Sequence, residues 1–156
     1  MSQRLEVFTS LWALQPHDQV GVSLPYRDVV WMVKEAGYAG LALDLGAADI
    51  AVFDEVAPLL ADAGLTPLLV AFPKTVAELR YVLKRAKDIG APFVDVIGQV
   101  TPLTVEGMIP VIRAWIEMAE DEGVPIQFET HRNCITNDLY TTLTLLDAIP
   151  EMRLCA

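Results

Sequence analysis

Cysteine is scarce in this chain, and no long apolar run is present. Cys134 and Cys155 are the two cysteines among 156 residues, and they form neither a metal-type spacing nor a disulfide framework. No apolar run approaches the roughly 18–20 residues of a membrane-spanning helix. The first residues, MSQRLE, lack the charged-then-apolar layout of a secretory signal. These absences predict a cytoplasmic protein without a membrane partner.

Basic residues are also few. The chain has 11 Lys and Arg against 21 Asp and Glu, which gives a net charge of −10. The densest basic group is Lys84, Arg85 and Lys87, and a solvated helix face accounts for it. Because a negative chain repels the phosphate backbone, the charge predicts that nucleic acid is not a partner.

Two classes of motif are missing as well. No GxGxxG or GxxxxGK[ST] loop follows the first apolar segment, which argues against a nucleotide-binding fold. No GxSxG elbow is present, and Cys134 has His131 near it only in sequence. Nucleophilic catalysis is therefore poorly supported, and we expect Cys134 to be a small buried residue.

What the chain has is a repeat punctuated by glycine. Hydrophobic residues make up 53% of the sequence, enough for one domain over residues 1–156 with a real core. Four glycines, each just past an amphipathic segment, have the placement of helix C-caps: Gly37, Gly64, Gly90 and Gly123. Short apolar runs surround them, and we expect strands at 5–12, 39–45, 66–71, 93–97, 124–129 and 152–156. A unit of about 30 residues is the size of a βα repeat.

The helices between these strands have start signals of differing strength. Pro25 suits the first turn of a helix that runs to about Ala36. Thr75 is expected to cap the third helix, with Glu78 completing a capping box. Pro110 leaves the start of the fourth helix open. Thr136 or Asn137 is expected to open the fifth.

Alternating strands and helices predict an α/β fold with a parallel sheet. Two architectures fit. A doubly wound sheet is normally complete in about this length, whereas a (β/α)8 barrel needs about 250 residues. The chain would then supply only five or six βα units of an incomplete TIM barrel, an open barrel segment.

The fifth apolar run ends in three polar residues that suit a ligand or metal site. Alternation places Ile126 and Phe128 on one face and Glu129 and His131 on the other. Burying such a polar face without partners would cost roughly 1–3 kcal/mol per neutral group. The alternative is an edge strand with a solvated face. Arg132 next to them could bind a substrate carboxylate or phosphate, or form a surface ion pair.

Other polar or aromatic residues fall at the ends of the earlier predicted strands. In a parallel α/β fold, the C-terminal strand ends share one edge where ligands bind. Ser10 and Trp12 follow the first strand, Asp44 ends the second and Gln99 follows the fourth. Trp12 is either a core aromatic or a pocket wall, and Asp44 is either a site residue or a helix cap. Together they describe a polar mouth suited to a small hydroxylated ligand.

The order of units, the segment AGYAGLALD that ends at Asp44, and Phe128-Glu129-Thr130-His131 resemble the sugar phosphate isomerase/epimerase family. That family belongs to the xylose-isomerase-like TIM barrels. The similarity covers the whole chain but only about the first two thirds of such a barrel. The family's second strand usually ends in Glu, where this chain has Asp44.

The resemblance implies a divalent-metal-dependent isomerase or epimerase that acts on a sugar or sugar phosphate. Glu129 matches the first metal ligand and is a possible acid or base. His131, Trp12, Gln99, Arg132 and Asp44 would contact the substrate. The metal would be Mn, Mg, Co or Zn. The later ligands of the family lie beyond the sixth strand, so we expect this chain alone to bind metal weakly or not at all.

Two alternatives and one consequence remain open at this stage. The chain could be a non-catalytic α/β association module or an inactive fragment. A metal-dependent hydrolase of abasic DNA is a further alternative, which the net charge of −10 opposes. An unclosed barrel would leave strand edges unpaired and expose interior residues such as Phe8 and Ile97, so we expect self-association.

Overall fold

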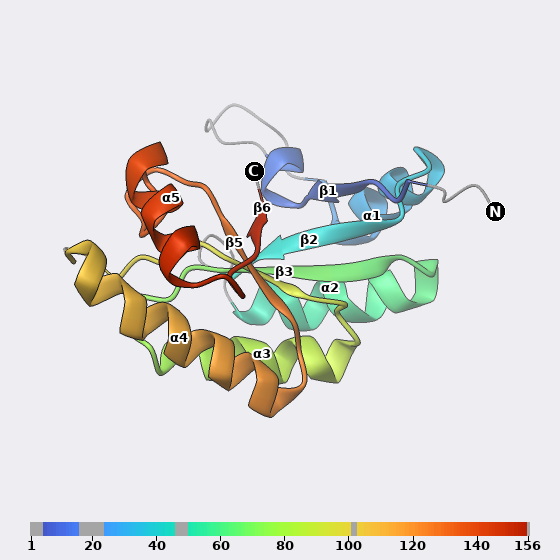
Figure 1. Ribbon diagram of the computed structural model, residues 1–156. Coiled ribbons are helices and arrows are strands. Elements are labelled where there is room, and N and C mark those ends of the chain that lie inside the picture. The colour runs from blue at the N-terminus through green and yellow to red at the C-terminus, as the bar shows by residue number, and fades with distance from the viewer. Residues whose placement is uncertain (1–4, 16–23, 46–49, 101–102, 156) are drawn as a thin grey trace. The chain divides into compact units, whose positions relative to one another are not determined.

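The computed structural model describes residues 5–15, 24–45, 50–100 and 103–155, in which strands alternate with helices (Figure 1). The strands are β1 (Phe8–Ser10), β2 (Gly40–Asp44), β3 (Thr66–Ala71), β4 (Val94–Val96), β5 (Ile126–Glu129) and β6 (Leu154–Cys155). The helices are α1 (Tyr26–Glu35), α2 (Ile50–Ala63), α3 (Glu78–Ile89), α4 (Val105–Glu122) and α5 (Leu139–Ala148), and a 3-10 turn, η1 (Trp12–Leu14), follows β1.

The six strands form one sheet in the order β1-β2-β3-β4-β5-β6, which is the order of the sequence. The strands are parallel; for example, Phe8 pairs with Gly40, and Val94 pairs with Ile126. A doubly wound sheet would reverse its strand order part-way along. The sequential order therefore selects the incomplete (β/α)8 barrel that was one of the two predicted architectures.

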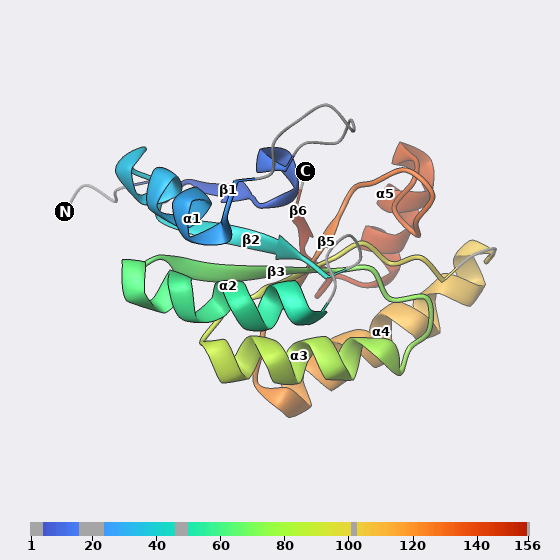
Figure 2. The same cartoon turned by 180° about the vertical axis from the view of Figure 1, so that it is seen from behind.

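The chain divides into two compact units, residues 1–68 and 69–156. The boundary falls inside β3, so the first unit contains β1, β2 and the start of β3, and the second contains the rest. In the first unit α1 packs on α2, and in the second α3 packs on α4 (Figure 2). That the chain forms a single domain stays a prediction.

Glycine ends four of the helices as predicted. Gly37, Gly64, Gly90 and Gly123 have φ values of 82°, 63°, 70° and 71°, the left-handed conformation of a C-cap. Gly40 is required for a different reason, because a Cβ there would lie 2.0 Å from the backbone oxygen of Thr66. These positions fix the turn from each helix into the following strand.

The helix starts differ from the sequence prediction. The capping box at Thr75 is wrong: Ala77 precedes α3 without a side-chain cap, and Glu78 instead accepts from the Lys74 N–H at 2.7 Å. The fifth helix is capped by Asp138, whose carboxylate accepts from the Thr141 N–H at 2.9 Å. A carboxylate at the N-cap also interacts favourably with the positive end of the helix dipole, which explains why Asp is preferred at this position.

The sequence left the start of the fourth helix open because of Pro110, and the structure places the N-cap at Thr104. Its hydroxyl accepts from the Gly107 N–H at 3.2 Å, so α4 begins at Val105 and contains Pro110. Pro110 is the sixth residue of α4, so the Glu106 carbonyl lacks its donor four residues on, and we expect the helix to bend there.

The core of the second unit lies between β4, β5 and α4. Trp115 of α4 is fully buried, its ring centroid lies 6.2 Å from that of Phe128, and its Nε1–H donates to the Val76 carbonyl at 3.2 Å. The predicted exposure of Ile97 is wrong: it is only 2% exposed. The backbone just after β4 is covered on both sides, since Val96 and Gly98 are buried too. None of the described helices is long and apolar enough to cross a membrane.

Candidate functional site

Strand β5 has one apolar face and one polar face, as its alternation predicted. Ile126 and Phe128 are buried, and Phe128 points to Trp115 on α4. Gln127 and Glu129 are half-buried and belong to the opposite face. The edge-strand alternative is excluded, because β5 pairs with β4 on one side and β6 on the other. Strand β5 is therefore internal to the sheet, and strands β4 and β6 flank its polar side chains.

Four polar side chains meet on this face. Strand register places Asp95 of β4 opposite Gln127, and Cys155 of β6 opposite Glu129. The Asp95 carboxyl is hydrogen-bonded by the side chains of Cys155 and Gln127, and Glu129 acts on it through its charge. The Oδ1 atom of Asp95 is buried and has no hydrogen-bond partner among the described residues. We call Asp95, Gln127, Glu129 and Cys155 the β4–β6 polar cluster.

The polar cluster is electrostatically unusual because it gathers negative groups in a partly desolvated place. Burial first, and the charge of Glu129 second, raise the pKa of Asp95 from 3.8 to about 6. Burial and the charge of Asp95 also raise the pKa of the Cys155 thiol to about 11. Cys155 is therefore a neutral thiol at pH 7, and a cation near the two carboxylates would relieve their repulsion.

The residues that follow β5 present an imidazole next to Glu129. The half-buried His131 has Nδ1 2.7 Å from the carbonyl oxygen of Arg132. Since a carbonyl only accepts, Nδ1 carries the proton in this contact, which leaves Nε2 as the acceptor or ligand nitrogen of a neutral ring. Arg132 itself is exposed. Its role as a substrate contact stays a prediction.

The strand ends of the first unit carry their own polar pair. The hydroxyl of Ser10 donates to Oδ2 of Asp44 at 2.7 Å, and its oxygen accepts from the Trp12 N–H at 3.1 Å. Trp12 is 53% exposed, which excludes the core-aromatic alternative. Asp44 is thus occupied by a neutral donor from the neighbouring strand.

Gln99 belongs to the second unit. It is half-buried, and its N–H donates to the Pro73 carbonyl at 2.9 Å. A common cleft of Glu129, His131, Gln99 and Trp12 stays a prediction, since Trp12 belongs to the other unit. Among the described residues, no three His, Cys, Asp or Glu side chains are arranged to hold a metal ion. The carboxylate of Glu129 suits a hard divalent cation, but it supplies one ligand position rather than a complete site.

Three residues that matter here were missed by sequence reasoning. Asp95 stands in Val-Asp-Val, so an acid between two apolar strand residues was the available signal. Cys155 joins the cluster through the strand register, which places it opposite Glu129 and cannot be read from the sequence. Thr136, predicted as a helix start, is instead buried, and its hydroxyl donates to the Glu129 carbonyl at 2.6 Å. Cys134 is buried, as predicted.

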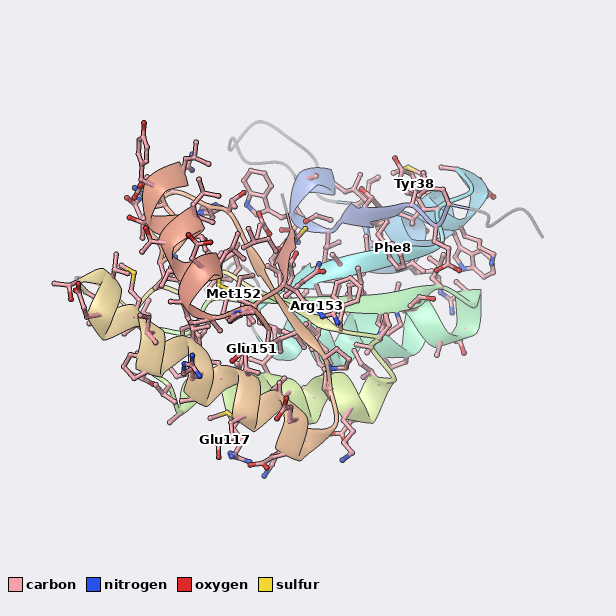
Figure 3. All side chains as sticks on the ribbon, viewed as in Figure 1. Phe8, Tyr38, Glu117, Glu151, Met152 and Arg153 are labelled. Carbon is pink, nitrogen blue, oxygen red and sulfur yellow. The ribbon has the colours of Figure 1, made fainter. Side chains whose placement is uncertain are left out.

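A groove of the second unit lies away from these residues. Its volume is about 680 Å3, and it borders α4, β5 and the residues that lead into β6, where Figure 3 labels Glu151, Met152 and Arg153. Glu129 is not among its lining residues. The groove is therefore separate from the β4–β6 polar cluster.

Comparison with known proteins gives likeness in structure only. No protein-family model and no curated protein matches the chain. The probable 3-DHS dehydratase AsbF of Bacillus anthracis matches with a TM-score of 0.69 and 15% identity, covering 96% of this chain and 61% of its own. A xylose isomerase-like TIM barrel protein of Mycobacterium smegmatis, in complex with magnesium, gives 0.67 and 14%, covering 96% and 62%. A D-allulose 3-epimerase of Methylomonas sp. gives 0.62 and 19%, covering 98% and 63%.

These likenesses confirm the fold. The chain has an incomplete TIM-barrel fold and spans about three fifths of the length of the structures named above. At identities of 14–19%, they say nothing about which reaction the chain takes part in.

Proposed function

We propose that the chain forms the N-terminal part of a divalent-metal-dependent isomerase or epimerase that acts on a small sugar or sugar phosphate in the cytoplasm. The observation that carries the proposal is Glu129, a half-buried carboxylate at the C-terminal end of an internal parallel strand, whose charge acts on Asp95 of the next strand. In this fold such strand ends are where ligands bind and reactions occur. A magnesium-bound protein and an epimerase are among the proteins that share this fold, so the fold is compatible with such a reaction.

In this proposal Glu129 is a metal ligand and a possible acid or base. The bound ion would supply Lewis acidity at the sugar carbonyl. Nε2 of His131 would accept a hydrogen bond from a sugar hydroxyl, because Nδ1 is already engaged with the Arg132 carbonyl. Trp12, exposed on η1, would provide an apolar wall beneath the sugar, and Gln99, Arg132 and Asp44 would contact its polar groups.

The test is proton exchange at the carbon next to the sugar carbonyl. In a protein that carries the complete barrel, we expect Mn2+ and a ketohexose in D2O to give deuterium at that carbon, measured by proton NMR. Glu129→Gln should abolish the exchange and leave the fold intact, because an amide is a poorer ligand and no base. Full exchange in Glu129→Gln would contradict the assignment, and Glu117→Gln, which changes an exposed carboxylate of α4, is the matched control.

We also propose that the chain self-associates through α5, which supports the association module as a second candidate function. Leu139, Tyr140 and Leu143 are 67%, 82% and 49% exposed, an unusual gathering of apolar side chains on one short helix. Light scattering should show a species larger than a monomer that becomes monomeric when all three residues are changed to Ser. A monodisperse monomer before the change would contradict self-association.

A further inference from the structure

Few polar side chains are buried among the described residues, and one of them contacts the backbone of the candidate site. Among the described residues, the buried polar side chains are Thr136 and Thr142, 3% and 5% exposed. The Thr142 hydroxyl donates to the Asp138 carbonyl four residues earlier at 2.7 Å, an ordinary contact within a helix. The Thr136 hydroxyl instead reaches the Glu129 carbonyl, seven residues earlier, at 2.6 Å. Thr136 thus bonds to the residue that the proposed function needs most.

The Thr136 hydroxyl also contacts Cys134, whose thiol lies against the His131 carbonyl. The Cys134 thiol lies 2.6 Å from the His131 carbonyl, to which it donates, and 3.1 Å from the Thr136 oxygen. Because the Thr136 proton points to Glu129 and the single thiol proton points to His131, the 3.1 Å contact between these two side chains is packing rather than a third hydrogen bond. The buried side chains of Thr136 and Cys134 therefore donate hydrogen bonds to the backbone carbonyls of Glu129 and His131, respectively.

The backbone of this loop is folded back to allow these contacts. Asn133 has φ of 57°, the left-handed conformation that Asn tolerates better than most residues, and its N–H donates to the Asn137 side chain at 2.8 Å. Ile135, fully buried, donates its N–H to the Gly98 carbonyl at 2.9 Å. The loop is thus attached to the segment after β4 as well as to β5.

We propose that Thr136 is a positioning residue for Glu129 and His131. Its hydroxyl fixes the end of β5 and, through Cys134, the first turn of the loop, so that the carboxylate and the imidazole are held in one arrangement before a ligand arrives. This inference rests on the proposed function only in saying what the arrangement is for. The arrangement itself is a property of the loop and is measurable without a ligand.

The first test is amide hydrogen exchange by NMR in the purified chain. Thr136→Val removes the hydroxyl, Thr136→Ser keeps it, and Thr142→Val is the matched control that removes the other buried hydroxyl. We expect the amides of Thr130 and Ile135 to exchange at least about tenfold faster in Thr136→Val, and within about twofold of the native rate in Thr136→Ser and Thr142→Val. Native exchange rates in Thr136→Val, or equal acceleration in Thr136→Ser, would overturn the proposal.

The second test is Mn2+ binding in a protein that carries the complete barrel, followed by electron paramagnetic resonance in the same variants. We expect Thr136→Val to weaken binding by about 10-fold or more and Thr136→Ser to restore it, as for other residues that orient a ligand. If Glu129→Gln abolishes binding while Thr136→Val leaves it native, the positioning role fails and the proposed function stands. If the complete barrel with native residues binds no Mn2+, the metal assignment fails, and the exchange rates alone decide the positioning role.

A third variant decides the question if Thr136→Val does not fold. Cys134→Ala removes the link to the His131 carbonyl and leaves the bond from Thr136 to Glu129 in place. We expect it to change the His131 ring nitrogen signals and to speed exchange of the Ile135 amide, with Thr130 unaffected. Native ring signals and native exchange in this variant would overturn the proposal.

Discussion

The strand ends of the two units both carry a carboxylate, but in different surroundings. In the first unit Asp44 receives the Ser10 hydroxyl at 2.7 Å, so one neutral donor satisfies it. In the second unit the charge of Glu129 acts on Asp95, and Oδ1 of Asp95 is buried without a partner among the described residues. The first pair is a satisfied hydrogen bond, whereas the second concentrates negative charge where water is partly excluded.

This difference indicates which strand end attracts a cation and which does not. A satisfied pair needs nothing further, and its removal is expected to cost only the hydrogen bond. Two neighbouring acids lower the stability of the folded chain unless a cation or a proton joins them, and such arrangements are typical of sites. The predictions that follow test this contrast.

The largest expected effect is on cation binding. Glu129→Gln should weaken Mn2+ binding by at least about 100-fold, because it removes a direct ligand, and the loss should exceed that from changing an orienting residue. Asp44→Asn should leave binding within about twofold. Isothermal titration calorimetry with Mn2+ measures the binding affinity of both variants. Equal losses in the two variants would remove the contrast between the units.

The next effect concerns the packing that holds the β5–α5 loop in the second unit. A Cβ at Gly98 would lie 2.8 Å from Trp115 and 2.9 Å from Ile135, both fully buried. Gly98→Ala should therefore lower the free energy of unfolding by about 1–3 kcal/mol, measured by urea denaturation. Gly107→Ala is the control: its Cβ would meet the flexible Leu103 side chain at 3.3 Å and the Thr104 hydroxyl oxygen at 3.7 Å, and alanine favours the helix. Loss of stability in the control alone would contradict the packing account.

A smaller effect is the pH dependence caused by Asp95. Its folded pKa of about 6 lies above 3.8, so the folded chain holds the proton more tightly than the unfolded chain. The free energy of unfolding should fall as pH rises from 3.8 to about 6. Asp95→Asn should add about 1 kcal/mol at pH 7, after allowing for solvent screening of the half-buried carboxyl, and nothing below pH 3.8. Thermal unfolding across this range measures it, and a pH-independent gain would exclude charge as the cause.

The smallest effect lies in the first unit. Ser10→Ala removes the donor to Asp44 and should lower the free energy of unfolding by about 1 kcal/mol or less, since water replaces the hydroxyl at a half-buried carboxylate. Mn2+ binding should not change. A change in binding larger than about twofold would assign Ser10 and Asp44 to the site and end the contrast.

The sequence was informative about elements whose signals are local. Glycine with a positive φ ends helices whatever lies around it, so the prediction at Gly37, Gly64, Gly90 and Gly123 was confirmed. Helix starts were less predictable, because several residues near a start can accept the first N–H groups. Asp138 does so at α5, where Thr136 and Asn137 were expected.

The candidate site was predictable only in part, for a physical reason. Period-two alternation within one strand placed Glu129 and Gln127 opposite Phe128. The partners of Glu129 come from other strands, and their register is set by packing across the sheet rather than by local sequence. Asp95, Cys155 and Thr136 therefore became visible only in the folded chain.

The most direct test of the central claim, that the end of β5 is a cation site, is the position of Mn2+ in crystals of a protein that carries the complete barrel. Anomalous scattering from crystals grown with Mn2+ locates the ion without any assumption about activity. The account predicts a peak about 2.0–2.2 Å from a carboxylate oxygen of Glu129. A peak at Asp44 or on the outer helices, with none at Glu129, would contradict it.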